Sequence, residues 1–209
     1  MTQEFDAMVL AGGAARRLGG VDKPRLTVGG RTLLDRVLVA CTGARRTVVV
    51  GPGESAGEVR WTREQPPGGG PVAAVAAGLA AGAGTAPVLL LLAADLPFLD
   101  AATVRRLVAA VTGPVQAAVL VDGQGREQPL VGAYRSDALR AALAGLGEPA
   151  GQPLRRLVGG LRTVRLADPD RVGEDCDTWE AVAAARHRAE ISPGVQGAGE
   201  RNEATGTPP

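Results

Sequence analysis

Short apolar runs alternate with segments of helical periodicity along most of this chain, and that alternation restricts its fold more than any other feature. The runs expected to form strands are Ala7–Leu10, Thr47–Val50, Val59–Trp61, Pro87–Ala94, Val115–Val121, Pro129–Tyr134 and Leu161–Leu166. The segments expected to form helices are Thr32–Ala40, Val72–Ala81, Asp100–Val111, Ser136–Leu143, Pro153–Val158 and Asp177–Arg188. Strands that alternate with helices favour right-handed crossovers, so we expect an α/β protein with a mostly parallel sheet.

The length and composition are typical of one domain with a packed core. The chain has 209 residues, of which 45% are hydrophobic and only 2% aromatic, so the core must consist of Leu, Val and Ala. We expect this domain to span residues 1–190. The composition from Ile191 to Pro209 shifts to Gly, Pro, Ser, Thr, Asn and Glu, which predicts a disordered tail.

The charge and the cysteines argue against several classes of protein. A net charge of +1 argues against a general nucleic-acid or membrane-surface partner. Cys41 and Cys176 are too few and too far apart in sequence for a disulfide framework or a zinc site. The polar start, Met1–Asp6, is unlike a secretory signal, and the longest apolar run is too short to cross a bilayer. We therefore expect a cytoplasmic protein.

The first apolar run leads into a glycine-rich, basic loop, Leu10–Pro24. Gly12 and Gly13 allow a sharp turn and a close approach of the backbone to a ligand. Successive backbone N–H groups in such a turn bind anions, and two arginines and Lys23 add positive charge. The spacing fits neither the P-loop nor the dinucleotide fingerprint. The stretch therefore predicts a third kind of loop, one that binds a polyphosphate.

Lys23 is the only lysine in the chain, and all other members of the Lys and Arg group are arginines. A lysine ammonium is a compact point charge, while an arginine guanidinium is a planar fork. A role that needs the ammonium would explain why one lysine is kept beside the glycines. A chance lysine on a surface turn is the alternative.

The string from Leu10-Ala-Gly-Gly to Arg17-Leu-Gly-Gly-Val-Asp-Lys23 resembles the signature of the MobA-like nucleotidyltransferases. Within that family it is most similar to the molybdenum cofactor guanylyltransferases, and the resemblance runs, with gaps, from about residue 7 to about residue 188. It implies a single-domain Rossmann-like three-layer sandwich of the nucleotide-diphospho-sugar transferase type.

The resemblance also implies a reaction. GMP would pass from GTP to molybdopterin that carries molybdenum, with release of pyrophosphate, and the acceptor's own phosphate would be the nucleophile. Lys23, Arg17 and Asp95 are the expected catalytic residues. The residues expected to bind the nucleotide are Leu10, Ala11, Gly12, Gly13, Arg17, Lys23, Gly51, Glu64, Gln65 and Asp95.

Asp95 is the first candidate for a metal ligand, because it follows the most apolar run of the chain. Ligands of open α/β sheets bind outside the carboxyl ends of the strands. An acid among apolar neighbours, with no basic residue nearby in sequence, needs a cation. Mg²⁺ takes one or two carboxylates plus substrate phosphates, and Asp95-x-Pro97 is similar to the family's magnesium site. An aspartate that only caps the turn before Pro97 is the alternative.

The segment before the last helix contains two further acids. Asp177 with Glu180 three residues later fits an N-cap with its capping-box partner, and we expect this role for Asp177. Asp175 would then be left over as a second candidate metal ligand. The segment resembles the family's Asn-x-Asn-Thr-Pro-Glu stretch, with Asp in place of Asn and Trp179 in place of Pro.

Two more segments resemble parts of the family that contact substrates. Glu64-Gln65 stands where the family usually has Glu-Asp for recognition of the base, so the choice between guanine and cytosine stays open. Glu64 or backbone carbonyl groups would then read the base. Arg126 and Gln128 stand in the segment that faces the acceptor, although a solvated loop arginine is an equal reading of Arg126.

Two other functions remain as alternatives. One is a cytidylyltransferase for the same cofactor, or a sugar-phosphate nucleotidyltransferase of the same fold. The other is a nucleotide-binding accessory module without activity, although the presence of both Lys23 and Asp95 argues against it. We expect a monomer whose further partners are molybdoenzymes or their chaperones.

Overall fold

The computed structural model describes residues 3–12, 21–55 and 57–191. Its main sheet has seven strands in the order β5-β4-β1-β6-β8-β7-β9. In chain order these strands are β1 (Phe5–Leu10), β4 (Thr47–Val50), β5 (Val59–Thr62), β6 (Val88–Ala93), β7 (Ala117–Val121), β8 (Glu127–Arg135) and β9 (Thr163–Ala167). The predicted strands are therefore confirmed, with ends that differ by a few residues.

The sheet is mostly parallel, as predicted. Only β8 runs the other way, antiparallel to both β6 and β7. This antiparallel direction was not predicted from the sequence. The turn between β7 and β8 explains it, because residues 122–126 are too few to cross the sheet and close a tight hairpin instead.

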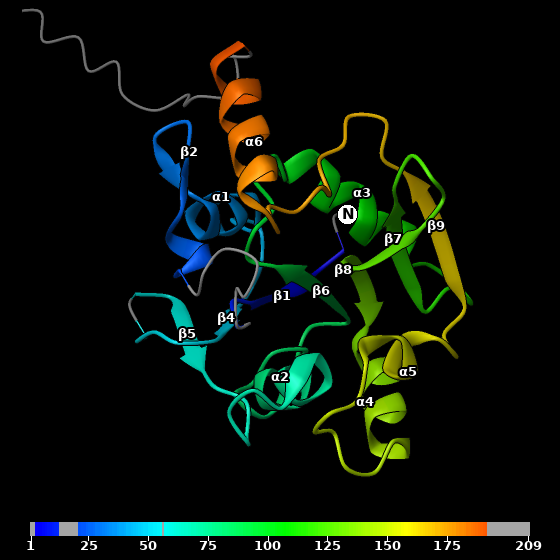
Figure 1. The fold of residues 1–209 in the computed structure, drawn as a ribbon. Coiled ribbons are helices and arrows are strands. Elements are labelled where there is room, and N and C mark those ends of the chain that lie inside the picture. The colour runs from blue at the N-terminus through cyan, green and yellow to red at the C-terminus, as the bar shows by residue number, and fades with distance from the viewer. Residues whose placement is uncertain (1–2, 13–20, 56, 192–209) are drawn as a thin grey trace, which may run out of the picture.

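Helices cover both faces of the sheet and make three layers (Figure 1). On one face are α1 (Leu33–Ala40) and α3 (Ala101–Ala110), and on the other are α2 (Gly70–Ala80), α4 (Ser136–Gly145) and α5 (Leu154–Val158). The last helix, α6 (Trp179–Ile191), packs with a small hairpin of β2 (Thr27–Val28) and β3 (Arg31–Thr32). This hairpin and the 3-10 turn η2 (Lys23–Arg25) were not predicted.

The core is aliphatic, as the composition requires. Strand β6 is buried along almost its whole length, because helices pack on both of its faces, and it contributes four consecutive leucines. Tyr134 differs from this aliphatic core because it is a fully buried aromatic residue with a polar hydroxyl, which donates to the carbonyl of Pro129 at 2.7 Å. Helix starts follow local rules, since Thr32 caps α1 and Asp100 caps α3 through their side-chain oxygens.

Helix α6 ends at Ile191, which the sequence analysis assigned to the tail, so this residue is helical. The rest of the predicted tail, residues 192–209, lies outside the described residues. Within the described part of the chain, no helix has both the length and the apolar character that a membrane crossing requires.

Candidate nucleotide and metal site

The candidate site lies where β1, β4 and β6 end side by side. Ala11 donates its backbone N–H to Val50 at 2.8 Å, which joins the end of β1 to the end of β4. Ala94 donates to Leu10 at 3.1 Å, which joins the end of β6 to the same place. The parallel register therefore brings together segments that are far apart in sequence, including the one that carries Asp95.

Two predicted nucleotide-binding glycines make close contacts at this edge. A Cβ on Gly51 would lie 2.8 Å from the carbonyl carbon of Ala11, so only glycine fits there without a backbone shift. A Cβ on Gly12 would lie 3.7 Å from Oε1 of Glu64, so the start of the glycine loop borders that carboxylate. Glu64 is held in place by the backbone N–H of Gly68, which donates to Oε1 at 3.1 Å.

Of the remaining predicted nucleotide-binding residues, the structure describes Gln65 but not Gly13 or Arg17. Gln65 is exposed and follows Glu64 directly. Gly13 and Arg17 lie outside the described residues, so their roles stay predictions. The described part of the loop resumes at Val21 and leads into η2, which begins with Lys23 and Pro24.

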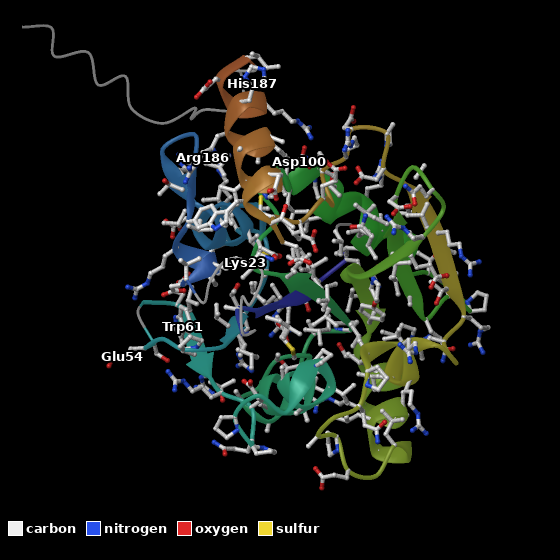
Figure 2. The ribbon with its side chains drawn as sticks, viewed as in Figure 1. Lys23, Glu54, Trp61, Asp100, Arg186 and His187 are labelled. Carbon is white, nitrogen blue, oxygen red and sulfur yellow. The ribbon has the colours of Figure 1, made fainter. Side chains whose placement is uncertain are left out.

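Lys23 lies near the centre of the view in Figure 2 and forms ion pairs with two carboxylates of the site. Its Nζ contacts Oδ2 of Asp95 and Oδ1 of Asp177. The lysine side chain is only 14% exposed. Burial by itself would lower the lysine pKa, but the two carboxylates outweigh burial and raise the pKa above its usual value. The ammonium therefore stays charged at neutral pH.

Three carboxylates converge around this ammonium. Asp95, Asp175 and Asp177 each offer one oxygen, and these oxygens lie within 4.8 Å of one another. Asp95 is buried, and within the described residues its Oδ1 has no hydrogen-bond partner. Burial, followed by the charges of Asp95 and Asp177, raises the pKa of the Asp175 carboxyl. A buried oxygen without a partner among crowded carboxylates suits a hard divalent cation, so the residues fit a metal site.

The backbone explains how Asp175 and Asp177 reach Asp95. The N–H of Cys176 donates to the carbonyl of Asp95 at 3.2 Å, and the Cys176 side chain is buried in the core beside α6. The two acids on either side of Cys176 are thereby fixed next to the end of β6. Burial raises the pKa of the Cys176 thiol to about 11, so this cysteine is an uncharged packing residue at neutral pH.

The expected N-cap role of Asp177 is wrong. Oγ1 of Thr178 accepts the N–H of Ala181 at 3.2 Å, so Thr178 caps α6. Asp177 lies one residue earlier and contacts Lys23 instead. The capping-box rule favoured Asp177 because Glu180 follows it at the box spacing, whereas Ala181 cannot complete a box with Thr178.

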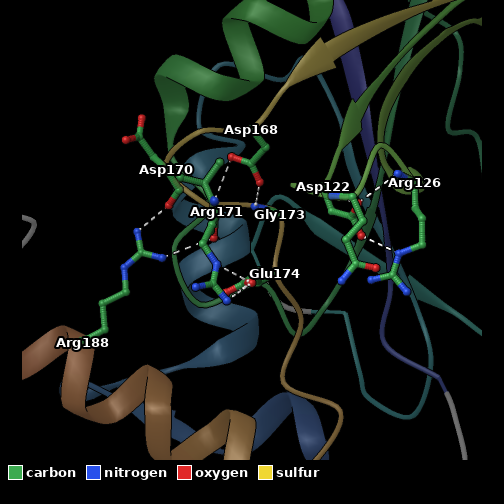
Figure 3. Close-up of polar contacts among 10 residues, drawn as sticks. Asp122, Arg126, Asp168, Asp170, Arg171, Gly173, Glu174 and Arg188 are labelled. Atoms are coloured by element: carbon green, nitrogen blue, oxygen red, sulfur yellow. Dashed lines mark hydrogen bonds and ion pairs between the residues drawn. The ribbon is translucent and has the colours of Figure 1, made fainter.

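A cleft of about 890 Å³ continues from Asp175 toward the turn between β7 and β8. Arg126 and Gln128, the two residues predicted to face the acceptor, both line it. Nε of Arg126 donates to Oδ2 of Asp122 at 2.7 Å, and Asp122 also accepts the backbone N–H of Arg126 at 2.9 Å (Figure 3). The backbone and guanidinium donors of Arg126 lower the pKa of the half-buried Asp122 carboxyl.

Sequence reasoning missed Asp122 and Arg171, which line the same cleft. Asp122 directly follows β7, so a search for acids at strand ends would have found it. Arg171 gave no comparable local signal.

The comparisons with known proteins agree with this geometry. Residues 7–166 match the model of the MobA-like NTP transferase domain. The chain belongs to this family. The resemblance inferred from the loop signature is thereby confirmed.

Similar proteins carry related names. A molybdenum cofactor guanylyltransferase from Acidiphilium cryptum is 37% identical over 175 residues, which are 78% of this chain and 84% of that protein. A solved structure of molybdopterin-guanine dinucleotide biosynthesis protein A from Archaeoglobus fulgidus has a TM-score of 0.69 at 20% identity, covering 89% of this chain and 99% of that one. A cytidylyltransferase for 2-C-methyl-D-erythritol 4-phosphate from Thermus thermophilus has a TM-score of 0.67 at 21% identity, covering 90% and 100%. The predicted three-layer fold is therefore confirmed.

Proposed function

We propose that this protein transfers GMP from GTP to molybdopterin that carries molybdenum, and that it releases pyrophosphate. Family membership and the 37% identical guanylyltransferase support the reaction class. The observation that carries the proposal is the meeting of Lys23 with three carboxylates at the strand edge where the glycine loop begins. Such a site can neutralise a triphosphate on one side and hold a cation on the other.

In the proposed reaction, a phosphate oxygen of the acceptor attacks the α-phosphorus of GTP. A new P–O bond forms there as the bond to the oxygen that leaves with pyrophosphate breaks. The chain needs no nucleophile of its own, so its contribution is positioning and charge neutralisation. Backbone N–H groups of the loop from Gly12 and the guanidinium of Arg17 would hold the triphosphate, while Lys23 would offset charge at the α-phosphate.

The metal ligands would be Asp95, Asp175 and Asp177, which hold Mg²⁺ through their carboxylate oxygens. When bound, Mg²⁺ supplies positive charge that neutralises the phosphate oxygens. The cation would also give the buried Oδ1 of Asp95 a partner, which this atom lacks within the described part of the chain. Asp177 joins the set in place of its expected capping role.

The acceptor would occupy the cleft beyond Asp175. Arg126, oriented by Asp122, and Gln128 face this space and would bind polar groups of the acceptor. Glu64 would accept the N1 and N2 hydrogens of guanine, because its carboxylate borders Gly12. We further propose that the protein works as a cytoplasmic monomer and passes its product to molybdoenzymes or their chaperones.

Pyrophosphate release from a panel of nucleoside triphosphates tests the proposal, with the acceptor and Mg²⁺ present. We expect turnover with GTP, loss of turnover with a chelator, and recovery with Mg²⁺. Asp95→Asn keeps the shape of the side chain but removes its charge, so activity should fall at least about a hundredfold while the fold survives. Asp35→Asn, at an exposed carboxylate on α1, is the control. Faster turnover with CTP would identify a cytidylyltransferase, and full activity of Asp95→Asn would refute the metal site.

A further inference from the structure

Arg188 of α6 contacts the loop at Asp170 and Arg171, as Figure 3 shows, and the same guanidinium also contacts the Phe98 ring. It donates to the carbonyl of Asp170 at 2.7 Å and to that of Arg171 at 3.3 Å. Its guanidinium carbon also lies 3.8 Å from the centre of the Phe98 ring, within the range of a cation–π contact. The guanidinium reaches the two carbonyls from two different nitrogens, whereas a lysine ammonium would have to donate both bonds from a single nitrogen.

The segments that Arg188 joins are the ones that carry the three acids. Phe98 follows Asp95 by three residues, and Arg171 precedes Asp175 by four. The bond from the Cys176 N–H to the Asp95 carbonyl is a single backbone link between them. Lys23 joins the acids themselves through its ion pairs with Asp95 and Asp177, and Arg188 adds a further link through Phe98 and the carbonyls of Asp170 and Arg171.

The loop from Asp168 to Glu174, which Arg188 contacts, is also stabilised by hydrogen bonds and an ion pair within the loop. The buried Asp168 carboxylate accepts the N–H groups of Val172 at 2.9 Å and Gly173 at 2.8 Å. Arg171 forms an ion pair with Glu174. Arg171 also has a φ of +52°, a left-handed conformation that a non-glycine residue keeps only when its surroundings impose it.

We propose that Arg188 is a positioning residue that sets the spacing between Asp95 and the pair Asp175 and Asp177. It acts through the loop from Asp168 to Glu174 and the Phe98 ring rather than by contact with the metal. Mg²⁺ demands near-ideal octahedral geometry, so a small shift between the carboxylates weakens its binding. The part of this inference that concerns metal affinity rests on the proposed function.

Three variants of the full-length protein isolate this role. Arg188→Ala removes all three contacts, and Arg188→Lys keeps the charge over Phe98 but loses the fork. Arg186→Ala is the matched control, because Arg186 lies on the same helix and donates instead to the carbonyl of Thr27 at 3.0 Å.

The first measurement is Mn²⁺ affinity, followed through the spin-resonance signal of the free ion. Loss of a residue that orients metal ligands typically weakens metal binding about 10- to 100-fold, and we expect this range for Arg188→Ala. Arg188→Lys should be intermediate and Arg186→Ala unchanged. Wild-type affinity in Arg188→Ala would overturn the proposal.

The second measurement needs no metal. Hydrogen exchange of the Cys176 amide should accelerate in Arg188→Ala, because its bond to Asp95 loses the neighbouring support, while amides of β6 keep their protection. Unchanged exchange at Cys176, or equal acceleration in β6, would overturn the positioning role. A third outcome separates the two proposals. If Arg188→Ala accelerates exchange at Cys176 but Asp95→Asn leaves Mn²⁺ affinity unchanged, the metal site is refuted and the positioning role stands.

Discussion

The ammonium of Lys23 lies between Asp95 and Asp177, and this pairing gives the single lysine of the chain a specific place. The contacts are made by one nitrogen that reaches two carboxylates from a short 3-10 turn. A guanidinium is wider and distributes its charge over a plane, so it would push the carboxylates or the bound phosphate apart.

We predict that Lys23→Arg is markedly impaired although its charge is kept. Lys23→Ala should lose more turnover, on the order of a hundredfold, because one preorganised charge contact is gone. Nucleotide affinity should fall less, since the loop N–H groups still bind phosphate. Steady-state kinetics beside a nucleotide titration measure both effects, and wild-type turnover of Lys23→Arg would show that any cation suffices.

Asp175 is crowded by the other two carboxylates, and its raised pKa reflects that crowding after the larger effect of burial. A carboxyl whose pKa is raised in the folded state costs stability at pH values where it is ionised. That cost is absent below about pH 3.8, where the group is protonated in both states.

We therefore predict that Asp175→Asn stabilises the metal-free protein at pH 7. The rise in melting temperature should be small, up to about 3 °C, because Asp175 is partly exposed to solvent. The difference should vanish as the pH falls toward 3.8, and Mn²⁺ affinity should drop in the same variant. Calorimetry across pH tests the first point, and a destabilised variant at pH 7 would contradict it.

At the scale of elements, α6 performs two tasks with neighbouring residues. Thr178 starts the helix, and Asp177 turns into the site. Farther along the same helix, Arg188 holds the loop that leads to these residues. At the start of α6, the helix cap Thr178 and the proposed metal ligand Asp177 are therefore adjacent residues.

Thermal unfolding can separate those two roles. Thr178→Ala should cost about 1 kcal/mol, the usual value of an N-cap, which corresponds to about 2–4 °C in a chain of this size. Because asparagine caps helices as well as aspartate does, the variant that discriminates is Asp177→Ala, which should leave the helix cap intact and affect metal binding instead. A larger loss of stability from Asp177→Ala than from Thr178→Ala would restore Asp177 as the cap.

The β7–β8 hairpin forms the wall of the cleft at which we propose that the acceptor binds. The pairing of the two strands shifts between Val119, which opposes Gly132, and Leu120, which opposes Gln128. The residues between Gln128 and Gly132 therefore have no partner in β7, although Val131 still pairs with Leu92 of β6. Within this bulge the Tyr134 hydroxyl donates to the Pro129 carbonyl. Gln128, at the edge of the bulge, lines the cleft.

Across the whole molecule, the functional groups come from both ends of the chain. The sheet order brings β1 next to β6, and the segment before α6 bonds through the Cys176 N–H to the carbonyl of Asp95 at the end of β6. Lys23 and Asp177 are 154 residues apart in sequence and in contact in space. The site is therefore intact only when the whole domain is folded.

Removal of residues 192–209 tests how much of the chain this domain needs. The composition of that segment offers little apolar surface to bury, so we predict nearly unchanged stability and turnover after truncation behind Ile191. Thermal unfolding and steady-state kinetics of the shortened protein measure this. A drop in melting temperature of several degrees would show that the segment packs against the domain.

Local patterns were sufficient to predict the strands of the main sheet, the α-helices and the family. Hydrophobic periodicity depends on residues that are near one another in the chain, and so does the loop signature from Leu10 to Lys23. The position of Asp95 after the most buried strand likewise indicated an acid at the ligand-binding edge of a parallel sheet.

The tertiary structure decided the features that depend on contacts between residues far apart in the sequence. Asp177 has the local features of a helix cap, but Lys23 attracts it into the site, and Thr178 caps the helix instead. The direction of β8 depends on pairing with both neighbours, and the role of Arg188 depends on carbonyl groups and a ring supplied by two other segments. Such contacts exist only after the chain has folded, because no local pattern contains both partners.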